Sequence, residues 1–273
     1  MRVDVYGANH SPWVQAVLLG LHEKSIEHSL RQVPPLQTLK KTAVLMPAVS
    51  FDAGPWQTES SQILAKLGFT PISEPDLAAV QAAWQGVLHR TDKPLDFFVG
   101  FADAGDDSAA LLQRSIRNFL RSFIAVYMFT LITYAKRVLK LPEPADFGDQ
   151  YLPWERALAA SAGPFIDGDA PGIRDLLLFG VVQCHCSIPT PPLTALQSDP
   201  RLSAMRGWIA TMHKRFSNYP HLYSGAYFAP NLPQPKRAGV GQRGLFYLGL
   251  LAMFVLLPVT LSLVIVLMIR VPR

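Results

Sequence analysis

Residues 45–64 constrain the fold of this chain most, because LMPAVSFDAGPWQTESSQIL reads as strand, turn, strand and helix start within twenty residues. The run 48–51 has the composition of a short strand, and residues 52–54 supply a turn that folds Trp56 back beside it. Residues 58–60 then come just before the apolar set Ile63, Leu64 and Leu67, which places them in the first turn of an amphipathic helix. A hairpin followed by a helix is therefore expected.

Two pairs of residues in this stretch have features of a binding site. The Met46–Pro47 bond belongs to the class of peptide bonds that adopt the cis form at low cost. In cis, it would turn the backbone N–H and C=O of Met46 outward, free to pair with an extended peptide. Glu59 and Ser60 stand at a helix start, which holds carboxylates through its free N–H groups and its dipole. The other interpretation is that Glu59 and Ser60 only cap the helix.

Charge and cysteine content narrow the class of protein. The formal charge of +5 comes with no Lys/Arg-rich run, so a nucleic-acid partner is disfavoured. An anionic membrane surface fits better, because basic residues flank one apolar segment, namely Lys236, Arg237, Arg243, Arg270 and Arg273. Cys184 and Cys186 are too few for a secreted disulfide framework and fit a reducing compartment. The first ten residues contain no apolar signal-peptide core, so we expect the folded part to face the cytoplasm.

The first 68 residues predict an α/β unit. Residues 3–6 form a strand candidate, and Ser11 followed by Pro12 starts a helix, because proline at the first helical position lacks an N–H that would be unpaired there. A second strand is expected over residues 26–33 and a short helix over residues 36–42. With the hairpin and its helix, this order is the thioredoxin-like arrangement, a four-stranded sheet with helices on its faces.

The run YGANHSPWVQAVLLGLHEKSIEHSL, residues 6–30, resembles the start of cytosolic glutathione transferases and is closest to their tau and omega-like classes. In those classes the residue before the proline is the catalytic Ser or Cys, so the resemblance implies a catalytic Ser11. Met46–Pro47 resembles the family's cis-proline step, and Glu59–Ser60 resembles the pair that holds the γ-glutamyl end of glutathione. Many relatives place a basic or polar residue shortly before the cis-proline, where this chain has Ala43, Val44 and Leu45, with only Lys40 and Lys41 nearby.

The resemblance implies a specific role for the Ser11 hydroxyl. Glutathione reacts as the thiolate, and a hydroxyl donor at a helix N-terminus stabilises that thiolate by a hydrogen bond and by the dipole. Because serine stands at this position, a mixed-disulfide mechanism there is disfavoured. The alternative is that Ser11 is a plain N-cap.

Beyond a linker at residues 70–75 the pattern is helical. One amphipathic segment covers residues 76–89, an irregular insertion is expected over 94–107, and a long helix over about 108–140. The charge-free middle of that helix predicts the buried centre of an all-α domain, with a membrane-resting face as the alternative. The segment 163–183 resembles the second domain of the same family, where an internal aspartate, here Asp175, is structural. Gly172 replaces the usual Ser or Thr cap, which removes the side-chain half of the capping box.

Cys184, His185 and Cys186 raise the question of a metal site. On a helix, residues two apart point to different sides, and there is no second cysteine pair, so we expect no metal here. Instead, we expect a pair of small buried thiols beside one hydrogen-bonded histidine.

Residues 245–269 are 25 consecutive positions without a charge. As one helix they would reach about 37 Å, enough to cross a bilayer of roughly 30 Å, and Pro258 would kink but not forbid the span. The sequence therefore predicts a single transmembrane helix, and the chain resembles a tail-anchored glutathione transferase.

Together these observations predict a thioredoxin-like glutathione-binding domain (residues 1–69), a linker (70–75), an all-helical domain (76–229), a second linker (230–244) and a transmembrane helix (245–269). The resemblance implies an enzyme that conjugates glutathione, its co-substrate, to lipophilic electrophiles, and that pairs as a homodimer. The second substrate is expected beside Ser11, near Trp13, Phe119 and Tyr127. The alternative is a non-catalytic membrane scaffold with the same fold, favoured by the missing basic residue before Met46 and by Gly172.

Overall fold

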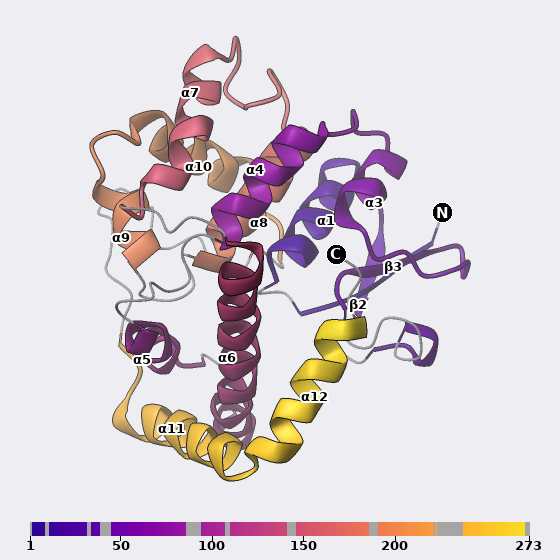
Figure 1. The fold of residues 1–273 in the computed structure, drawn as a ribbon. Coiled ribbons are helices and arrows are strands. Elements are labelled where there is room, and N and C mark those ends of the chain that lie inside the picture. The colour runs from indigo at the N-terminus through magenta and orange to yellow at the C-terminus, as the bar shows by residue number, and fades with distance from the viewer. Residues whose placement is uncertain are drawn as a thin grey trace.

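The computed structural model describes residues 2–8, 11–31, 34–38, 45–85, 94–106, 110–140, 146–185, 191–220, 222 and 237–270. Its first part is a small mixed sheet with helices, in the order β1 (Val3–Tyr6), α1 (Pro12–Glu23), β2 (His28–Arg31), β3 (Ala48–Phe51) and α3 (Ser60–Lys66). The described strands lie in the order β2-β1-β3, with β2 parallel and β3 antiparallel to β1 (Figure 1). This topology confirms the predicted α/β arrangement.

The hairpin after β3 differs from the prediction only in its second arm. Asp52 and Ala53 both have positive φ, and the Gly54 N–H donates to the Phe51 carbonyl to close the turn. The returning chain then makes one isolated bridge, between Gln57 and Val49, where a fourth strand was expected. The bridge is short because Pro55, which has no N–H, precedes it and α3 starts three residues after it.

The rest of the described chain is helical, as predicted. Its elements are α4 (Glu74–Gln85), α5 (Pro94–Ala104), α6 (Leu111–Leu139), the 3₁₀ turn η1 (Asp149–Tyr151), α7 (Leu152–Ala160), α8 (Ile173–His185), α9 (Pro191–Ser198), α10 (Ser203–Arg215), α11 (Val240–Val255) and α12 (Leu257–Arg270). Helix α10 buries one apolar face, which consists of Leu202, Met205, Trp208, Ile209 and Met212.

The main core lies between the sheet unit and the helices that follow it. Val14, Val17, Leu18 and Leu21 of α1 have no exposed surface, and they share one cluster with residues of α8 and α10. Helix α8 is buried almost all round from Ile173 to Gln183, so it serves as the central helix of this core. A helix that is apolar on every side is stable only in such a position.

A buried carboxylate fixes the turn that leads into α8. Asp175 accepts hydrogen bonds from the N–H groups of Ile166, Asp167 and Gly172 at 2.8–3.1 Å, and from Trp208 Nε1 at 2.8 Å. Burial raises the pKa of Asp175, while the hydrogen bonds from Ile166, Gly172 and Trp208 act in the opposite direction. The residue is therefore structural, as the resemblance implied.

The capping group that Gly172 lacks is supplied by a different residue. The Asp167 carboxylate accepts from the backbone N–H of Arg174, in the first turn of α8, and also from its guanidinium. A Cβ on residue 172 would lie 2.0 Å from Asp167 Oδ2, so the carboxylate fills the space that a serine or threonine cap would need. The helix N-terminus is thus capped from five residues upstream of Gly172.

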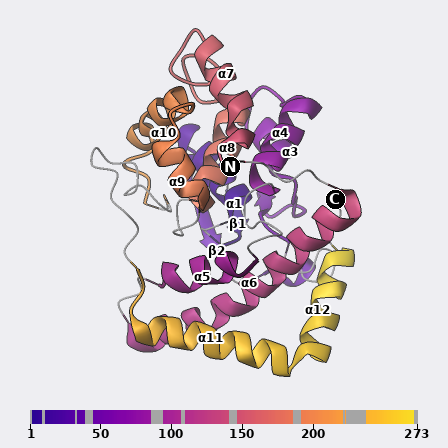
Figure 2. The same cartoon turned by 60° about the vertical axis from the view of Figure 1, so that its left-hand side comes forward.

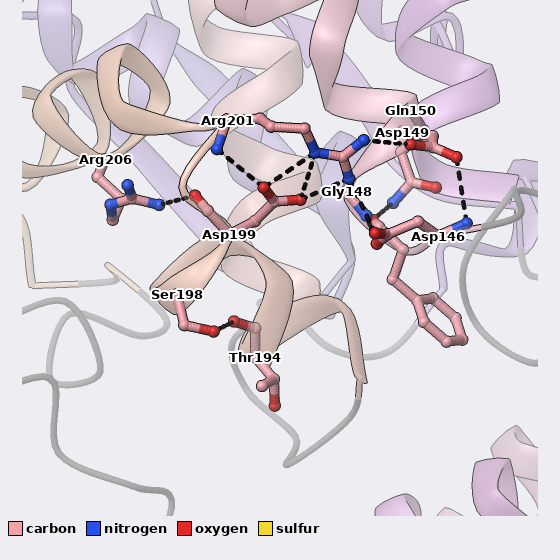
Figure 3. A network of polar contacts seen from close by, with 10 residues as sticks. Asp146, Gly148, Asp149, Gln150, Thr194, Ser198, Asp199, Arg201 and Arg206 are labelled. Atoms are coloured by element: carbon pink, nitrogen blue, oxygen red, sulfur yellow. Dashed lines mark hydrogen bonds and ion pairs between the residues drawn. The ribbon is translucent and has the colours of Figure 1, made fainter.

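A second polar network ties the loop before η1 to the start of α10 (Figure 3). Arg201 pairs with Asp146, Asp149 and Asp199 at 2.7–2.9 Å, and Gly148 lies against the Asp199 carboxylate, where a Cβ would be 2.1 Å from Oδ2. Hydrogen bonds from Arg201 hold the pKa of Asp199 below its usual value. The same end of α10 is capped by Glu155 of α7, which accepts from the N–H groups of Ala204 and Met205 at 2.7 Å.

Two predictions for the middle of the chain are wrong. The insertion expected over residues 94–107 is helix α5, in which Phe97 and Ala102 are buried against α6 and α11. Helix α6 is not buried all round, because apolar side chains on one side are about half to three-quarters exposed, namely Leu111, Leu112, Ile116, Leu120, Tyr134 and Val138. It packs through a single face, centred on Asn118, Ser122 and Ala125. The alternative of a membrane-resting face stays a prediction.

The single helix predicted over residues 245–269 is also wrong. Helix α11 ends at Val255, Leu256 leaves the helical geometry, and α12 starts at Leu257 with Pro258 in its first turn. Proline has no N–H to donate into the preceding turn, which explains why the chain bends here. Among the described helices, none combines the length and the apolar character that crossing a membrane requires.

The capping of α8 by Asp167 predicts that substitutions at positions 167 and 172 have non-additive effects on stability. Gly172→Ser alone should destabilise the protein by about 1–3 kcal/mol, because the new side chain meets the pinned Asp167 carboxylate. Combined with Asp167→Ala, the same serine has room to cap α8 and should recover about 1 kcal/mol. Thermal unfolding of both single variants and the double variant measures this coupling, and additive effects would contradict it.

The Arg201 network predicts a pH-dependent contribution to stability. The pKa of Asp199 is lowered in the folded state, so its contribution is present above the unfolded value of about 3.9 and is lost as pH falls through the lower folded value. Arg201→Gln should therefore lower the melting temperature at pH 7, and the difference from the native chain should shrink toward pH 2. The exposed Lys214→Gln serves as the charge-matched control. A difference that is constant with pH would contradict the assignment.

Candidate functional site

The sheet register brings Ser11 and the proline step to the same edge. Antiparallel pairing of β1 and β3 sets Tyr6 opposite Ala48, so the loop that follows β1 meets the residues that precede β3. The backbone N–H of Ala8 accordingly donates to Met46 Sδ at 3.3 Å. The Met46–Pro47 bond is cis, as the resemblance implied. Ser11 is linked to the same loop, since its N–H donates to the Ala8 carbonyl at 2.9 Å.

The hairpin returns Glu59 and Ser60 to this edge. Gln57 pairs with Val49 through two backbone hydrogen bonds of 2.8 Å. Because antiparallel partners step in opposite directions along the chain, residues 58–60 run back past residues 46–48. Strand pairing therefore gathers five candidate residues at one edge of the sheet, namely Ser11, Met46, Pro47, Glu59 and Ser60.

Glu59 is the N-cap of α3. Its Oε1 accepts from the Ser61 N–H at 3.3 Å and from the Ser61 hydroxyl at 3.2 Å. Ser60 is the first residue of the helix and is 5% exposed. The capping interpretation is thus confirmed for Glu59, and its carboxylate is engaged within the protein. The binding role predicted for Glu59 and Ser60 stays a prediction.

Ser11 occupies the N-cap position of α1, but its side chain does not cap the helix. Its backbone is extended, with φ −70° and ψ 128°, and its carbonyl accepts the first helical hydrogen bond, from Gln15, at 2.9 Å. The hydroxyl makes no capping hydrogen bond, so the plain N-cap interpretation of this side chain is wrong. A partly exposed hydroxyl therefore stands at the positive end of a twelve-residue helix.

Helix α8 holds the first turn of α1 in place. A Cβ on Gly180 would lie 2.1 Å from the Pro12 carbonyl oxygen and 3.0 Å from its carbon, so only glycine allows the two helices this close. The residue after Ser11 is thus in backbone contact with the central helix of the core. Because the two backbones are in contact, the buried helix α8 restricts movement of the first turn of α1, next to the Ser11 hydroxyl.

Trp13 was expected near Ser11, but its aromatic partner Trp84 was missed by sequence reasoning. Trp13 packs against Trp84 of α4, with ring centroids 6.1 Å apart, and Trp84 joins the main core to the cluster of α5, α6 and α11. A tryptophan in an amphipathic helix gives no sequence signal for this contact. Phe119 of α6 instead borders α11, because its carbonyl lies 2.7 Å from where a Cβ of Gly249 would be. The places predicted for Phe119 and Tyr127 beside Ser11 stay predictions.

Several of the remaining candidate residues have no place in the described structure. Lys40 and Lys41, together with Ala43 and Val44, lie outside the described residues. Cys186 does as well. Within the described ranges, no group of three His, Cys, Asp or Glu side chains could hold a metal ion. Burial raises the pKa of the Cys184 thiol to about 12, which keeps it protonated at neutral pH.

No family model matches the chain, and no curated protein matches it. Among solved structures, it is similar to a theta class glutathione S-transferase of Xanthomonas axonopodis pv. citri with glutathione bound (TM-score 0.46, 15% identity, 82% of this chain and 98% of that chain). It is also similar to a delta-class glutathione transferase of Nilaparvata lugens (TM-score 0.46, 14% identity, 90% and 99%). An epsilon-class enzyme of the housefly, Musca domestica, gives a TM-score of 0.43 at 16% identity over 90% and 96%. Scores and identities this low do not transfer those activities to this chain.

The contact at Gly180 predicts a stability cost with a matched control. Gly180→Ala should destabilise the protein by about 1–3 kcal/mol, because the methyl group forces α8 away from the Pro12 carbonyl. Gly207→Ala in α10 is the control, since nothing lies within 4 Å of its added Cβ, and it should be neutral or stabilising by up to about 1 kcal/mol. Thermal unfolding compares the two. Equal effects would contradict the close approach.

Proposed function

We propose that this chain is a glutathione transferase that conjugates glutathione to lipophilic electrophiles, with the Ser11 hydroxyl as the donor that stabilises the glutathione thiolate. The observation that carries the proposal is a hydroxyl at the N-terminus of α1 that is not used for capping, beside a cis Met46–Pro47 step. Both are what the resemblance at residues 6–30 and 46–60 implies for a glutathione site.

The proposed chemistry is electrostatic. A thiol bound at the start of α1 would lie near the Ser11 hydroxyl and the positive end of the helix dipole, and both favour the charged thiolate over the neutral thiol. The pKa of the bound thiol would fall below the value of about 8.5 typical of a free thiol, so more of it reacts at neutral pH. Ser11 itself stays protonated and donates. The thiolate forms the new carbon–sulfur bond as the electrophile's leaving group departs or its double bond takes up a proton.

The peptide part of glutathione would bind along the same edge. In the proposed complex, the outward backbone groups of Met46 pair with the extended tripeptide, and Ser60 at the start of α3 receives the γ-glutamyl carboxylate. Lys41 is proposed for the glycyl end. The Trp13–Trp84 pair offers an apolar wall next to Ser11 for the second substrate.

A second candidate function has an observation of its own. The Glu59 carboxylate already accepts two hydrogen bonds from Ser61, which leaves it less able to bind the amino group of a ligand. This favours a non-catalytic scaffold that retains the fold without a working glutathione site. The homodimer, the membrane location and the cytoplasmic orientation inferred from the sequence stay predictions under either function.

The two functions differ in what purified protein should do with glutathione. Under the transferase proposal, Ser11→Ala lowers kcat/KM toward a chlorodinitrobenzene-type electrophile by about 10²-fold, because one donor to the developing charge is lost. The pH at which kcat/KM reaches half its maximum should rise toward about 8.5, while the melting temperature stays within about 2 °C, since the hydroxyl does not cap α1.

Trp56→Phe, at the opposite end of the hairpin from the proline step, is the activity control and should leave kcat/KM and its pH profile unchanged. Absence of glutathione binding by calorimetry at millimolar ligand would overturn the transferase proposal and favour the scaffold.

A further inference from the structure

The C-terminal helices have an apolar face that the described protein leaves uncovered. Figures 1 and 2 show α11 along the lower edge of the molecule, on the far side of α5 and α6 from α7 and α10. Apolar side chains that are 44–72% exposed follow its outer side and continue through the bend into α12, namely Tyr247, Leu248, Leu251, Phe254, Val255, Leu256, Leu257, Val259, Leu261, Ile265 and Val266. We call these residues the outer face. Exposed apolar patches of this extent mark an interaction surface.

The opposite side of α11 is firmly attached to the protein. Phe246 and Leu250 are buried in a cluster with Phe97 and Ala102 of α5 and with Ala125 of α6. Gly249 brings the backbones of α11 and α6 close, since a Cβ there would lie 2.7 Å from the Phe119 carbonyl oxygen. Helix α11 therefore presents only its outer face to a partner, and the α5–α6 layer takes the place of the polar side that an interfacial helix normally has.

The start of α11 is attached by polar contacts as well. The Asp103 carboxylate at the end of α5 accepts a hydrogen bond from Arg237 Nε at 2.7 Å and lies 3.7 Å from Arg243 Nη1. The backbone carbonyl of Asp103 accepts from the Ala238 N–H at 2.8 Å. The Gln242 side chain accepts from the Asp106 N–H at 3.1 Å. These contacts set the direction in which α11 runs across α5 and α6.

The bend between α11 and α12 satisfies its own backbone. Thr260 Oγ1 lies within 3.1–3.3 Å of the carbonyls of Met253, Leu256 and Leu257, and the Ser262 hydroxyl donates to the Pro258 carbonyl at 2.8 Å. In lipid, backbone polar groups need partners within the protein because water is absent. The two hydroxyls give partners to some of the carbonyls at the bend, so the bend is compatible with an apolar surrounding.

The charge pattern selects the kind of partner. None of the 20 acidic residues lies after Asp199, whereas Arg237 and Arg243 precede the uncharged stretch and Arg270 follows it. Lys236 adds a third basic residue before the stretch and Arg273 a second one after it, so each end keeps about two positive charges once Asp103 is subtracted from the first. Two copies of this face would bring like charges together at their basic ends, but anionic lipid headgroups would neutralise them. A lipid surface therefore fits better than a second copy of the chain.

We propose that the outer face lies in the interfacial plane of an anionic membrane while α11 stays bound to α5 and α6. The chain then contacts one leaflet and does not cross it. This inference is independent of the proposed transferase activity, because its test uses lipid binding without glutathione.

The first test is flotation of the full-length protein with phosphatidylcholine vesicles, with and without phosphatidylserine. The native chain should float with both, more with phosphatidylserine, and the excess should fall at high salt. Leu251→Glu, on the outer face, should lower the vesicle partition coefficient about tenfold. Leu36→Glu, which replaces an equally apolar side chain 73% exposed elsewhere, should leave it unchanged. Circular dichroism checks that both variants fold.

Failure of the native chain to float, or equal flotation of the Leu251→Glu variant, would overturn the proposal. A Leu251→Glu variant that loses self-association while the native chain ignores vesicles would assign the face to a second copy instead.

The second test separates lying on the leaflet from crossing it. Gly239→Cys and Pro272→Cys are each made in a chain with Cys184 and Cys186 replaced by alanine, and are bound to sealed vesicles from outside. A membrane-impermeant maleimide should label both positions, since both stay on the outer side. Protection of position 272 until detergent opens the vesicles would overturn the in-plane arrangement.

Discussion

The arrangement of the candidate site depends on the close approach of α8 to the first turn of α1. Gly180 allows backbone contact with the Pro12 carbonyl, which no side chain at position 180 would permit. Through this contact the start of α1 belongs to the same packed unit as the buried Leu176, Leu177 and Phe179. A hydroxyl at residue 11 can act as a positioned donor only if the helix start does not drift, because misplacement by about 1 Å is costly in catalysis. The helical part of the chain thus fixes the position of the Ser11 hydroxyl, although the candidate site lies on the sheet unit.

The parts of the fold that could be predicted from the sequence are those governed by local chemistry. Ser11–Pro12 marked the start of α1, Asp52–Gly54 marked the turn after β3, and the periodic apolar residues of α10 marked its buried face. In each case the signal and the structure it specifies lie within a few residues. Local chemistry only permits the cis state of Met46–Pro47, and the expectation of it came from the resemblance. The candidate site residues came from the resemblance at residues 6–30 and 46–60, and strand pairing explains how the segments that carry them meet.

The parts that could not be predicted depend on contacts between distant segments. Residues 94–104 look irregular alone, but Phe97 and Ala102 gain a helical packing surface once α6 and α11 lie beside them. The charge-free run that begins at Leu245 is apolar enough to predict a membrane span. Hydropathy cannot predict that α11 packs against α6 through Phe246 and Leu250, or that the chain bends at Leu256. That Ser11 does not cap its helix also has no sequence signal, because a serine before a proline looks the same in both cases.

The four donors to Asp175 are unequally distant along the chain, which bears on the order of assembly. The N–H groups of Ile166, Asp167 and Gly172 lie within nine residues of the carboxylate, whereas Trp208 is 33 residues away. Closing the short loops costs little chain entropy, so the turn and the first turns of α8 can form as a local unit with most of the carboxylate already satisfied. Trp208 supplies the last hydrogen bond only when α10 docks. Asp175 therefore gains its fourth hydrogen bond, and the stabilisation that this bond adds, only when the helical core is completely assembled.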